Sequence, residues 1–316
     1  MPALIALVAD IGGTNTRIAL AVADARYEAF TCYVNRVQGS FEACLDDYLE
    51  RHGIVASDLA LVLAAAGPVV ADTVHLTNLD WTISGPALVT RYGFTAVSIV
   101  NDFAALAAAV PAFGADDLAA IGGGEAALDQ PALVLGPGTG FGASVWLPCG
   151  AVLATEAGHA LIAPVTDVEA SVLERLRRTH GPVSIEQVLS GEGLMRLYSA
   201  VAGETVFAHP TPAQIAERAV AGDDVAAVRS FELFFALLGI AARNLVLATG
   251  ARGGVYLAGG ILPRYPAALA ASSFRARFET PAPLPDYLER VPCWLVTHPA
   301  PALLGLGRIA ALRGRI

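Results

Sequence analysis

Two turns rich in glycine and threonine carry the strongest chemical signal in this sequence. The first covers residues 10–16, Asp-Ile-Gly-Gly-Thr-Asn-Thr, between two apolar segments typical of buried strands. Glycines let backbone amides approach an anion closely, and Thr14 and Thr16 can add hydroxyl donors. Asp10 can hold Mg²⁺ directly or through water. From this turn alone, an ordinary tight hairpin is an equally good interpretation.

A second turn of the same kind lies in the other half of the chain. Residues 136–142, Gly-Pro-Gly-Thr-Gly-Phe-Gly, again separate two apolar segments. A third glycine pair, Gly259 and Gly260, follows an apolar segment and precedes a helix expected near Pro263. Open α/β sheets place ligands at such positions, beyond the carboxyl ends of strands. Each turn could be a plain hairpin, but the three together favour phosphate binding.

Asn101 and Asp102 end a predicted strand and begin a predicted alanine-rich helix that runs to Val110. A carboxylate at this position can cap the helix, or it can act as a general base beside the phosphate sites. We favour the general base.

Three further polar side chains are candidates for binding a neutral sugar, which needs several carboxylate and imidazole partners for its hydroxyls. Glu156 and His159 stand in a stretch of small, apolar residues, and Glu186 lies at a predicted helix start. Taken one at a time, each is better explained by a structural role; Glu186, for example, could simply favour the helix dipole.

The elements around these residues alternate between strands and helices. The predicted strands are 4–8, 16–22, 27–34, 59–65, 96–100, 132–135, 254–258 and 293–296, and the predicted helices are 41–49 with Ser40 as N-cap, 86–92, 102–110, 169–179, 185–189, 230–247 and 303–312. The first half reads as βββαβαβα, an α/β arrangement, and the order then begins again. Because Gly13-Thr14 matches Gly138-Thr139, we predict a duplicated unit.

We expect two domains from this repeat and from the length of 316 residues. The smaller domain comprises residues 1–108 and 299–316 and carries the first turn and Asp102. The larger domain comprises residues 109–298 and carries the second turn, the candidate sugar residues and the third glycine pair.

The composition excludes several classes of protein. The net charge is −9, which argues against a nucleic-acid or anionic-membrane partner. All twenty basic residues are arginine, so a Walker P-loop, a protein-kinase fold and Schiff-base chemistry, which need lysine, are excluded. The four cysteines are scattered without zinc spacing, which suits a reduced, cytoplasmic protein. We see no signal peptide, and the glycine- and proline-broken stretch 132–155 favours sheet over a membrane span.

Together these segments resemble the bacterial glucokinase family, whose ribonuclease H-like fold is shared by hexokinase, actin and the heat-shock chaperone ATPases. The resemblance covers nearly the whole chain. It rests on residues 10–15 and 136–142 as phosphate loops, residues 77–78 with Trp81, 156–159 and 184–191 as sugar segments, 101–103 as the catalytic segment, and 254–263 as the adenosine segment. It implies two actin-like ATPase domains with a cleft between them.

The resemblance also implies roles for individual residues. Asp102 would be the base on the sugar 6-hydroxyl, and Asp10 would hold Mg²⁺. The sugar would be contacted by Asn78, Asn101, Asp102, Glu156, His159 and Glu186. The nucleotide would be contacted by Asp10, Gly12, Gly13, Thr14, Asn15, Gly138, Thr139, Gly140, Gly259 and Gly260. The expected activity is that of an ATP-dependent glucokinase of glycolysis, which forms glucose 6-phosphate and ADP in the cytoplasm.

Three departures from the family pattern stand out. Ala157 replaces a usual glycine, and Leu79 replaces a usual histidine. No cysteine lies between Cys149 and Cys293, so the chain does not resemble the zinc-containing repressor-and-kinase group.

Several alternatives stay open. The same fold could act on another hexose or use polyphosphate, and an actin-like or chaperone-like switching ATPase is the alternative from a different class. A sugar-responsive repressor would need a helix-turn-helix before the first turn, where nine residues stand. The sequence leaves a homodimer open.

Overall fold

The computed structural model describes residues 4–23, 26–67, 69–76, 79–127, 129–203, 210–280 and 285–313. The chain divides into two compact units. Unit 1 comprises Met1–Asp117, Gly150–Ala154 and His298–Ile316, and unit 2 comprises Leu118–Cys149 and Thr155–Thr297. The first unit border thus follows Asp117, whereas the sequence suggested a border after residue 108.

Unit 1 is built on a five-stranded sheet with the order β3-β2-β1-β4-β8. The antiparallel pairs are β1 with β2 and β2 with β3, and the parallel pairs are β1 with β4 and β4 with β8. The strands are β1 Leu4–Ile11, β2 Asn15–Val22, β3 Arg26–Val34, β4 Ala60–Ala65 and β8 Ala96–Asn101. The helices are α1 Asn35–Gln38, α2 Phe41–His52, α3 Gly85–Tyr92, α4 Asp102–Ala109 and α13 Pro301–Arg313.

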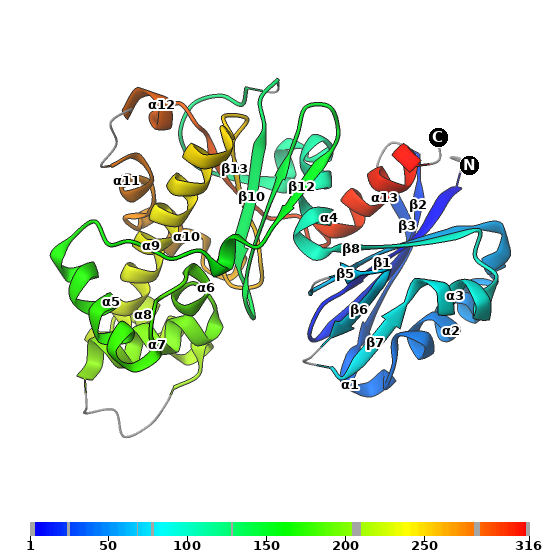
Figure 1. Cartoon of the computed structure of the whole chain (residues 1–316), viewed down its shortest axis with the longest axis horizontal. Coiled ribbons are helices and arrows are strands. Elements are labelled where there is room, and N and C mark those ends of the chain that lie inside the picture. Colours follow the sequence, from blue (N-terminus) through cyan, green and yellow to red (C-terminus); the bar gives the residue numbers. More distant parts are fainter. Residues whose placement is uncertain are drawn as a thin grey trace. The chain divides into compact units, whose positions relative to one another are not determined.

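Helices cover both faces of this sheet. Successive strand residues point to opposite faces, so the apolar strands present buried side chains on each side. Leu7 shares a buried core with side chains of α2 and α3, whereas Val8 shares a second core with α4 and α13. Helices α4 and α13 pack together, as Figure 1 shows. They approach so closely that a Cβ on Gly305 would lie 1.8 Å from the carbonyl oxygen of Ala105, which explains the small residues there. Ser40 caps α2 as the sequence predicts.

A small three-stranded sheet, β5-β6-β7, was not foreseen from the sequence. Its strands are β5 Val69–Val70, β6 Thr73–Leu76 and β7 Trp81–Ser84. Val74 and Ile83 from this sheet join the core beneath α2. Strands of two to four residues are too short to show a two-residue periodicity in the sequence.

Unit 2 repeats the same strand arrangement around a six-stranded sheet with the order β12-β11-β10-β13-β14-β9, although residues 152–154 of the edge strand β12 are grouped with unit 1. β10 pairs antiparallel with β11, as β1 does with β2. β10 also pairs parallel with β13, as β1 does with β4, and β13 pairs parallel with β14, as β4 does with β8. The strands are β9 Leu118–Gly122, β10 Ala132–Pro137, β11 Phe141–Trp146, β12 Val152–Thr155, β13 Val255–Leu257 and β14 Cys293–Val296. The predicted duplicated α/β fold is confirmed; the antiparallel edge strand β9 is an addition.

The helices of unit 2 surround α9, Val225–Thr249. The others are α5 Asp167–His180, α6 Ile185–Val188, α7 Gly191–Ala202, α8 Pro212–Ala221, α10 Pro266–Ala271, α11 Phe274–Glu279 and α12 Pro285–Glu289. α9 is long and apolar enough to span a membrane, but 72% of its most apolar window is buried inside the protein. Its side chains Phe231, Phe234 and Phe235 are buried in the core of the unit, which confirms the predicted interior helix. Figure 1 labels α9 among the other helices of this unit.

A buried carboxylate joins two helices of this unit. Glu169 accepts hydrogen bonds from the backbone amides of Val165 and Thr166 and from Arg277 Nε at 2.8 Å. Burial alone would raise the pKa of Glu169, but the hydrogen bonds from Arg277 and from the two amides outweigh it and hold that pKa below the usual 4.5. The first turn of α5 is thereby tied to α11.

Candidate functional site

The first glycine-rich turn connects β1 to β2 as the sequence predicts. It is closed by a hydrogen bond from Gly12 N to the Asn15 carbonyl at 3.0 Å. Gly13 and Thr14 are exposed at its tip, and nothing lies within 4 Å of the position that a Cβ on Gly13 would take. One expectation is corrected: Thr16 is fully buried and donates its hydroxyl to Asn35 Oδ1 at 2.8 Å, so that hydroxyl serves the fold.

Asp10 and Arg17 form an ion pair across this hairpin, where they are directly opposite in the strand register. Arg17 Nη1 lies 2.9 Å from Asp10 Oδ2. Burial raises the pKa of the Asp10 carboxyl, and the charge and hydrogen bond of Arg17 oppose that rise. Sequence reasoning missed Arg17, although the cross-strand register of a tight hairpin would have placed it beside Asp10.

Asp10 is also the candidate for holding Mg²⁺. Mg²⁺ in nucleotide enzymes is usually bound through one or two carboxylates together with phosphates and water. Asp10 offers a carboxylate beside the turn that would carry the phosphates, and Arg17 already engages one of its oxygens. The donor type fits the metal, and the ion pair favours a contact through water. In the described ranges, no group of three or more His, Cys, Asp or Glu side chains is placed to hold a metal.

Asn101, and not Asp102, caps α4. The Asn101 side-chain oxygen accepts hydrogen bonds from Phe103 N at 2.9 Å and from Ala104 N at 3.3 Å. Asp102 is the first residue of the helix, and its Oδ1 accepts from Phe103 N at 3.0 Å. The capping alternative for Asp102 is therefore wrong, and the oxygen of Asn101 is already in use. Asn101 can still donate from its side-chain nitrogen.

The first turn and Asp102 lie at the same edge of the sheet. In the register of the parallel strands, Ile11 pairs with Ala65, and Ala65 pairs with Asn101. The turn begins directly after Ile11, and Asp102 follows Asn101 directly. With about 4.8 Å between neighbouring strands, the two features begin about 10 Å apart. This is the carboxyl edge, where α/β sheets bind ligands.

The second turn connects β10 to β11, with Gly138 N donating to the Gly140 carbonyl at 2.7 Å. Gly259 lies against it: its φ is +90°, and a Cβ there would be 2.4 Å from the Pro137 carbonyl oxygen. Nothing crowds the Cβ position of Gly260, which is exposed. The two glycine segments of unit 2 therefore adjoin each other. The helix expected near Pro263 is only a 3₁₀ turn, Leu262–Arg264, so no long helix begins there.

Glu186, a residue of α6, contacts the second turn. Its Oε2 accepts a hydrogen bond from Phe141 N at 2.8 Å, and it lies so close to Gly140 that a Cβ there would be 2.4 Å from the same oxygen. Gly191 N donates to the Gly138 carbonyl at 3.0 Å, so the start of α7 also holds the turn. The sequence offered sugar contact or a helix-dipole role for Glu186, and the structure adds this contact with the turn.

Glu156 and His159 border the 3₁₀ turn Ala157–His159 and are both exposed, with Oε2 and Nε2 3.9 Å apart. Between them, Gly158 lies so close to the second turn that a Cβ would be 2.6 Å from the Phe141 carbonyl oxygen. Ala157, the departure from the family pattern, packs against the core instead. A glycine is therefore required at residue 158 but not at residue 157.

The segment 156–161, which contains Glu156 and His159, is also tied to α6, which carries Glu186. Ile185 N donates to the Ala160 carbonyl at 2.9 Å, and Leu161 bridges to Ser184. Unit 2 thus brings Glu156, His159 and Glu186 together with the second turn. Asn78 lies outside the described residues.

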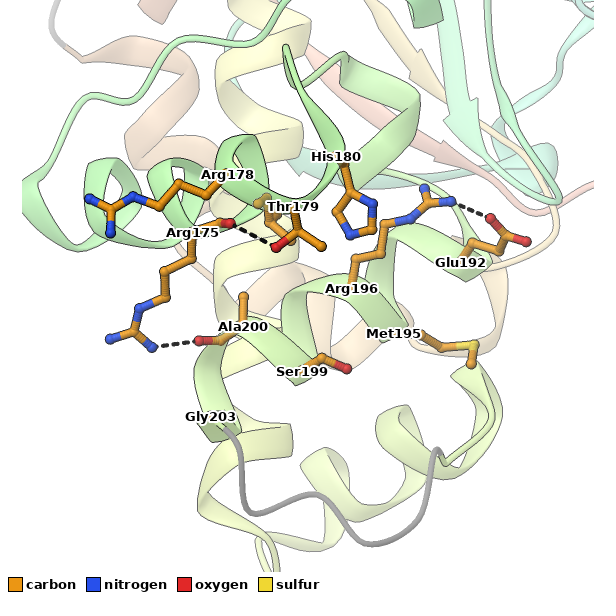
Figure 2. A pocket seen from close by; sticks show the side chains of 11 residues that line it. Arg175, Arg178, Thr179, His180, Glu192, Met195, Arg196, Ser199, Ala200 and Gly203 are labelled. Carbon is orange, nitrogen blue, oxygen red and sulfur yellow. Dashed lines mark hydrogen bonds and ion pairs between the residues drawn. The ribbon is translucent and has the colours of Figure 1, made fainter.

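A surface hollow of about 790 Å³ lies apart from these residues, between α5 and α7. Figure 2 shows two of its arginines engaged: Arg175 donates to the Ala200 carbonyl at 2.7 Å, and Arg196 pairs with Glu192. Basic side chains at helix C-termini complement the helix dipole. None of the residues predicted for the site is among those that line the hollow.

Comparison with known proteins identifies the chain. The model of the glucokinase family matches residues 7–313. A glucokinase of Paramagnetospirillum magneticum is 41% identical over 311 residues, which cover 95% of each chain. The crystal structure of a glucokinase from an Antarctic psychrotroph has a TM-score of 0.87 and 37% identity and covers 97% of this chain and 98% of its own. A glucokinase from Balamuthia mandrillaris in complex with glucose shares the fold, with a TM-score of 0.76 at 22% identity, covering 97% of this chain and 93% of its own.

The repeated sheets, with a glycine-rich turn in each copy, define a sugar kinase of the actin-like ATPase fold. Within that class, the chain belongs to the glucokinase family.

Proposed function

We propose that this chain transfers the γ-phosphoryl group of ATP to the 6-hydroxyl of glucose, with Asp102 as the general base. The observation that carries the proposal is the register of β1, β4 and β8, in which the first turn and Asp102 begin at one sheet edge. Phosphoryl transfer depends chiefly on positioning and charge stabilisation, so a base and a phosphate loop at one edge are the parts it needs.

Asp102 would accept the proton of the attacking hydroxyl. The carboxylate stands in the first turn of α4, where the helix dipole favours its ionised form. Asn101 would orient the same sugar by donating from its side-chain nitrogen, since its oxygen accepts from the backbone of α4.

Phosphate would be held without lysine. In unit 1 the exposed tip at Gly13 and Thr14 presents a backbone amide and a hydroxyl. In unit 2 the second turn offers Gly138, Thr139 and Gly140, and Gly259 with Gly260 would lie beside the adenosine. Mg²⁺, when bound, would neutralise charge on the phosphates, and Asp10 would contact it through water.

The remaining sugar contacts would come from unit 2. Glu156 and His159 have exposed polar ends able to meet hydroxyls, and Glu186 would join them through the carboxylate oxygen that does not accept from Phe141. Asn78 stays in the proposal on the resemblance alone. The four cysteines are free thiols, which fits a reducing compartment, and we place the reaction in the cytoplasm.

The purified chain tests this proposal directly. Glucose, ATP and Mg²⁺ should yield glucose 6-phosphate and ADP in equal amounts, measured by two separate coupled assays. Other hexoses and polyphosphate, tested in place of glucose and ATP, define the specificity. ATP hydrolysis that glucose does not stimulate would instead indicate a switching ATPase. Sedimentation of the same sample distinguishes a monomer from a homodimer.

A further inference from the structure

The buried residue Asn35 is hydrogen-bonded to the first turn. It is the first residue of α1, is 1% exposed, and makes three hydrogen bonds to alternate residues of the turn. Its side-chain nitrogen donates to the Gly12 carbonyl at 2.7 Å, its side-chain oxygen accepts from Thr16 Oγ1 at 2.8 Å, and its backbone amide donates to the Thr14 carbonyl at 2.9 Å. Both ends of the side chain and the backbone are therefore committed to one turn.

These contacts determine which way the turn presents its own amides. Across a trans peptide, the carbonyl of one residue and the N–H of the next point in opposite directions. Because the Gly12 carbonyl is directed at Asn35, the N–H of Gly13 is directed away from Asn35. The space next to Gly13 is open, with nothing within 4 Å of a Cβ position there. The amide is thus held ready for an anion before any anion binds.

A carboxamide meets both demands with one side chain. The Gly12 carbonyl can only accept, so a donor must face it, and the same group must offer an acceptor to the Thr16 hydroxyl. Aspartate would set a carboxylate oxygen against the Gly12 carbonyl at a separation of 2.7 Å. Alanine would leave the buried Thr16 hydroxyl and the Gly12 carbonyl without these hydrogen bonds, which is costly.

We propose that Asn35 is a positioning residue for the nucleotide: it orients the first turn so that the Gly13 amide can bind a phosphate oxygen. This inference rests on the proposed function, in which the first turn binds ATP. Asn35 itself does not touch the phosphate. Its effect is transmitted through Gly12, and it should therefore act on nucleotide affinity and leave glucose affinity nearly unchanged.

The test compares Asn35→Asp and Asn35→Ala with the matched control Tyr48→Phe. Tyr48 is also fully buried in unit 1 and donates one hydrogen bond to the Ala29 carbonyl at 2.8 Å, remote in sequence from the turn. Calorimetry measures the Kd of ADP with Mg²⁺ and, separately, the Kd of glucose, and thermal unfolding records stability. Both Asn35 variants should weaken ADP binding by roughly tenfold. Tyr48→Phe should lower the Tm without changing the Kd of ADP.

Thr16 supplies a second test in case the Asn35 variants do not fold. Thr16→Ser keeps the hydroxyl and should bind ADP like the wild type, whereas Thr16→Val should weaken ADP binding severalfold. An ADP Kd equal to the wild-type value in a folded Asn35 variant, or in Thr16→Val, overturns the proposal. So does an equal loss of ADP and glucose affinity, because that is the signature of a merely structural role. A wild-type chain that binds no nucleotide would instead reject the proposed function.

Discussion

Replacing Asp102 with asparagine separates catalysis from helix capping. The cap of α4 belongs to Asn101, which accepts from Phe103 N and Ala104 N at 2.9 and 3.3 Å. Asparagine at residue 102 keeps an oxygen that can accept the 3.0 Å bond from Phe103 N. The change removes one carboxylate charge from the first turn of a helix, which is worth about 0.3–1 kcal/mol.

The expected catalytic loss is much larger. Removing a general base lowers kcat by roughly 10²–10⁴, which corresponds to about 2.7–5.4 kcal/mol in the activation free energy. We expect Asp102→Asn to show this loss in kcat. Glucose binding should weaken far less, because the amide still offers a hydrogen-bonding oxygen. The assays are steady-state kinetics with a coupled enzyme, glucose calorimetry and thermal unfolding.

Glu42→Gln is the matched control for Asp102→Asn. Glu42 is the acidic residue in the first turn of α2, in the same unit, and the change removes the same charge from a helix N-terminus. It should cost similar stability and leave kcat unchanged. A folded Asp102→Asn enzyme that keeps more than about a tenth of the wild-type kcat would refute the role of Asp102 as base.

Three further predictions follow from the geometry of unit 2. Glu156→Gln and His159→Ala should raise the KM for glucose more than that for ATP, with a loss of roughly 1–3 kcal/mol in kcat/KM; equal effects on both substrates would indicate a structural role. Gly259→Ala should lower the Tm and the affinity for ATP because its φ is +90° and the space for a Cβ is filled, whereas Gly260→Ala, with open space, should leave the Tm unchanged. The pKa of Glu169 is lower in the folded chain than its usual 4.5, so its contribution to stability is complete above that pH and is lost as the pH falls through the lower folded-state value. Urea unfolding between about pH 3 and 6 should show a larger acid-side loss of stability in the wild type than in Glu169→Gln, which keeps only the losses from other carboxylates such as Asp224.

Local patterns in the sequence were sufficient for the main elements and for the positions of the turns. Apolar segments bounded by glycine predicted the central strands of both sheets, and Ser40 as N-cap predicted the start of α2. The duplication followed from two matching Gly-Thr turns, because the same strand–turn–strand unit folds in the same way in both halves. The absence of lysine excluded whole classes of ATP chemistry without any structure.

Only the tertiary structure decided which polar side chains hold the turns. Asn35 contacts Gly12, 23 residues away, and Glu186 contacts Phe141, 45 residues away. Such pairs depend on how strands and helices pack, and no short motif records that packing. The choice between two adjacent residues as cap was likewise set by the extended backbone of Asn101, with φ −65° and ψ 146°, at the end of β8. The sequence by itself therefore determined the chemistry on offer and the elements that carry it, whereas long-range hydrogen bonds decided how each side chain is used.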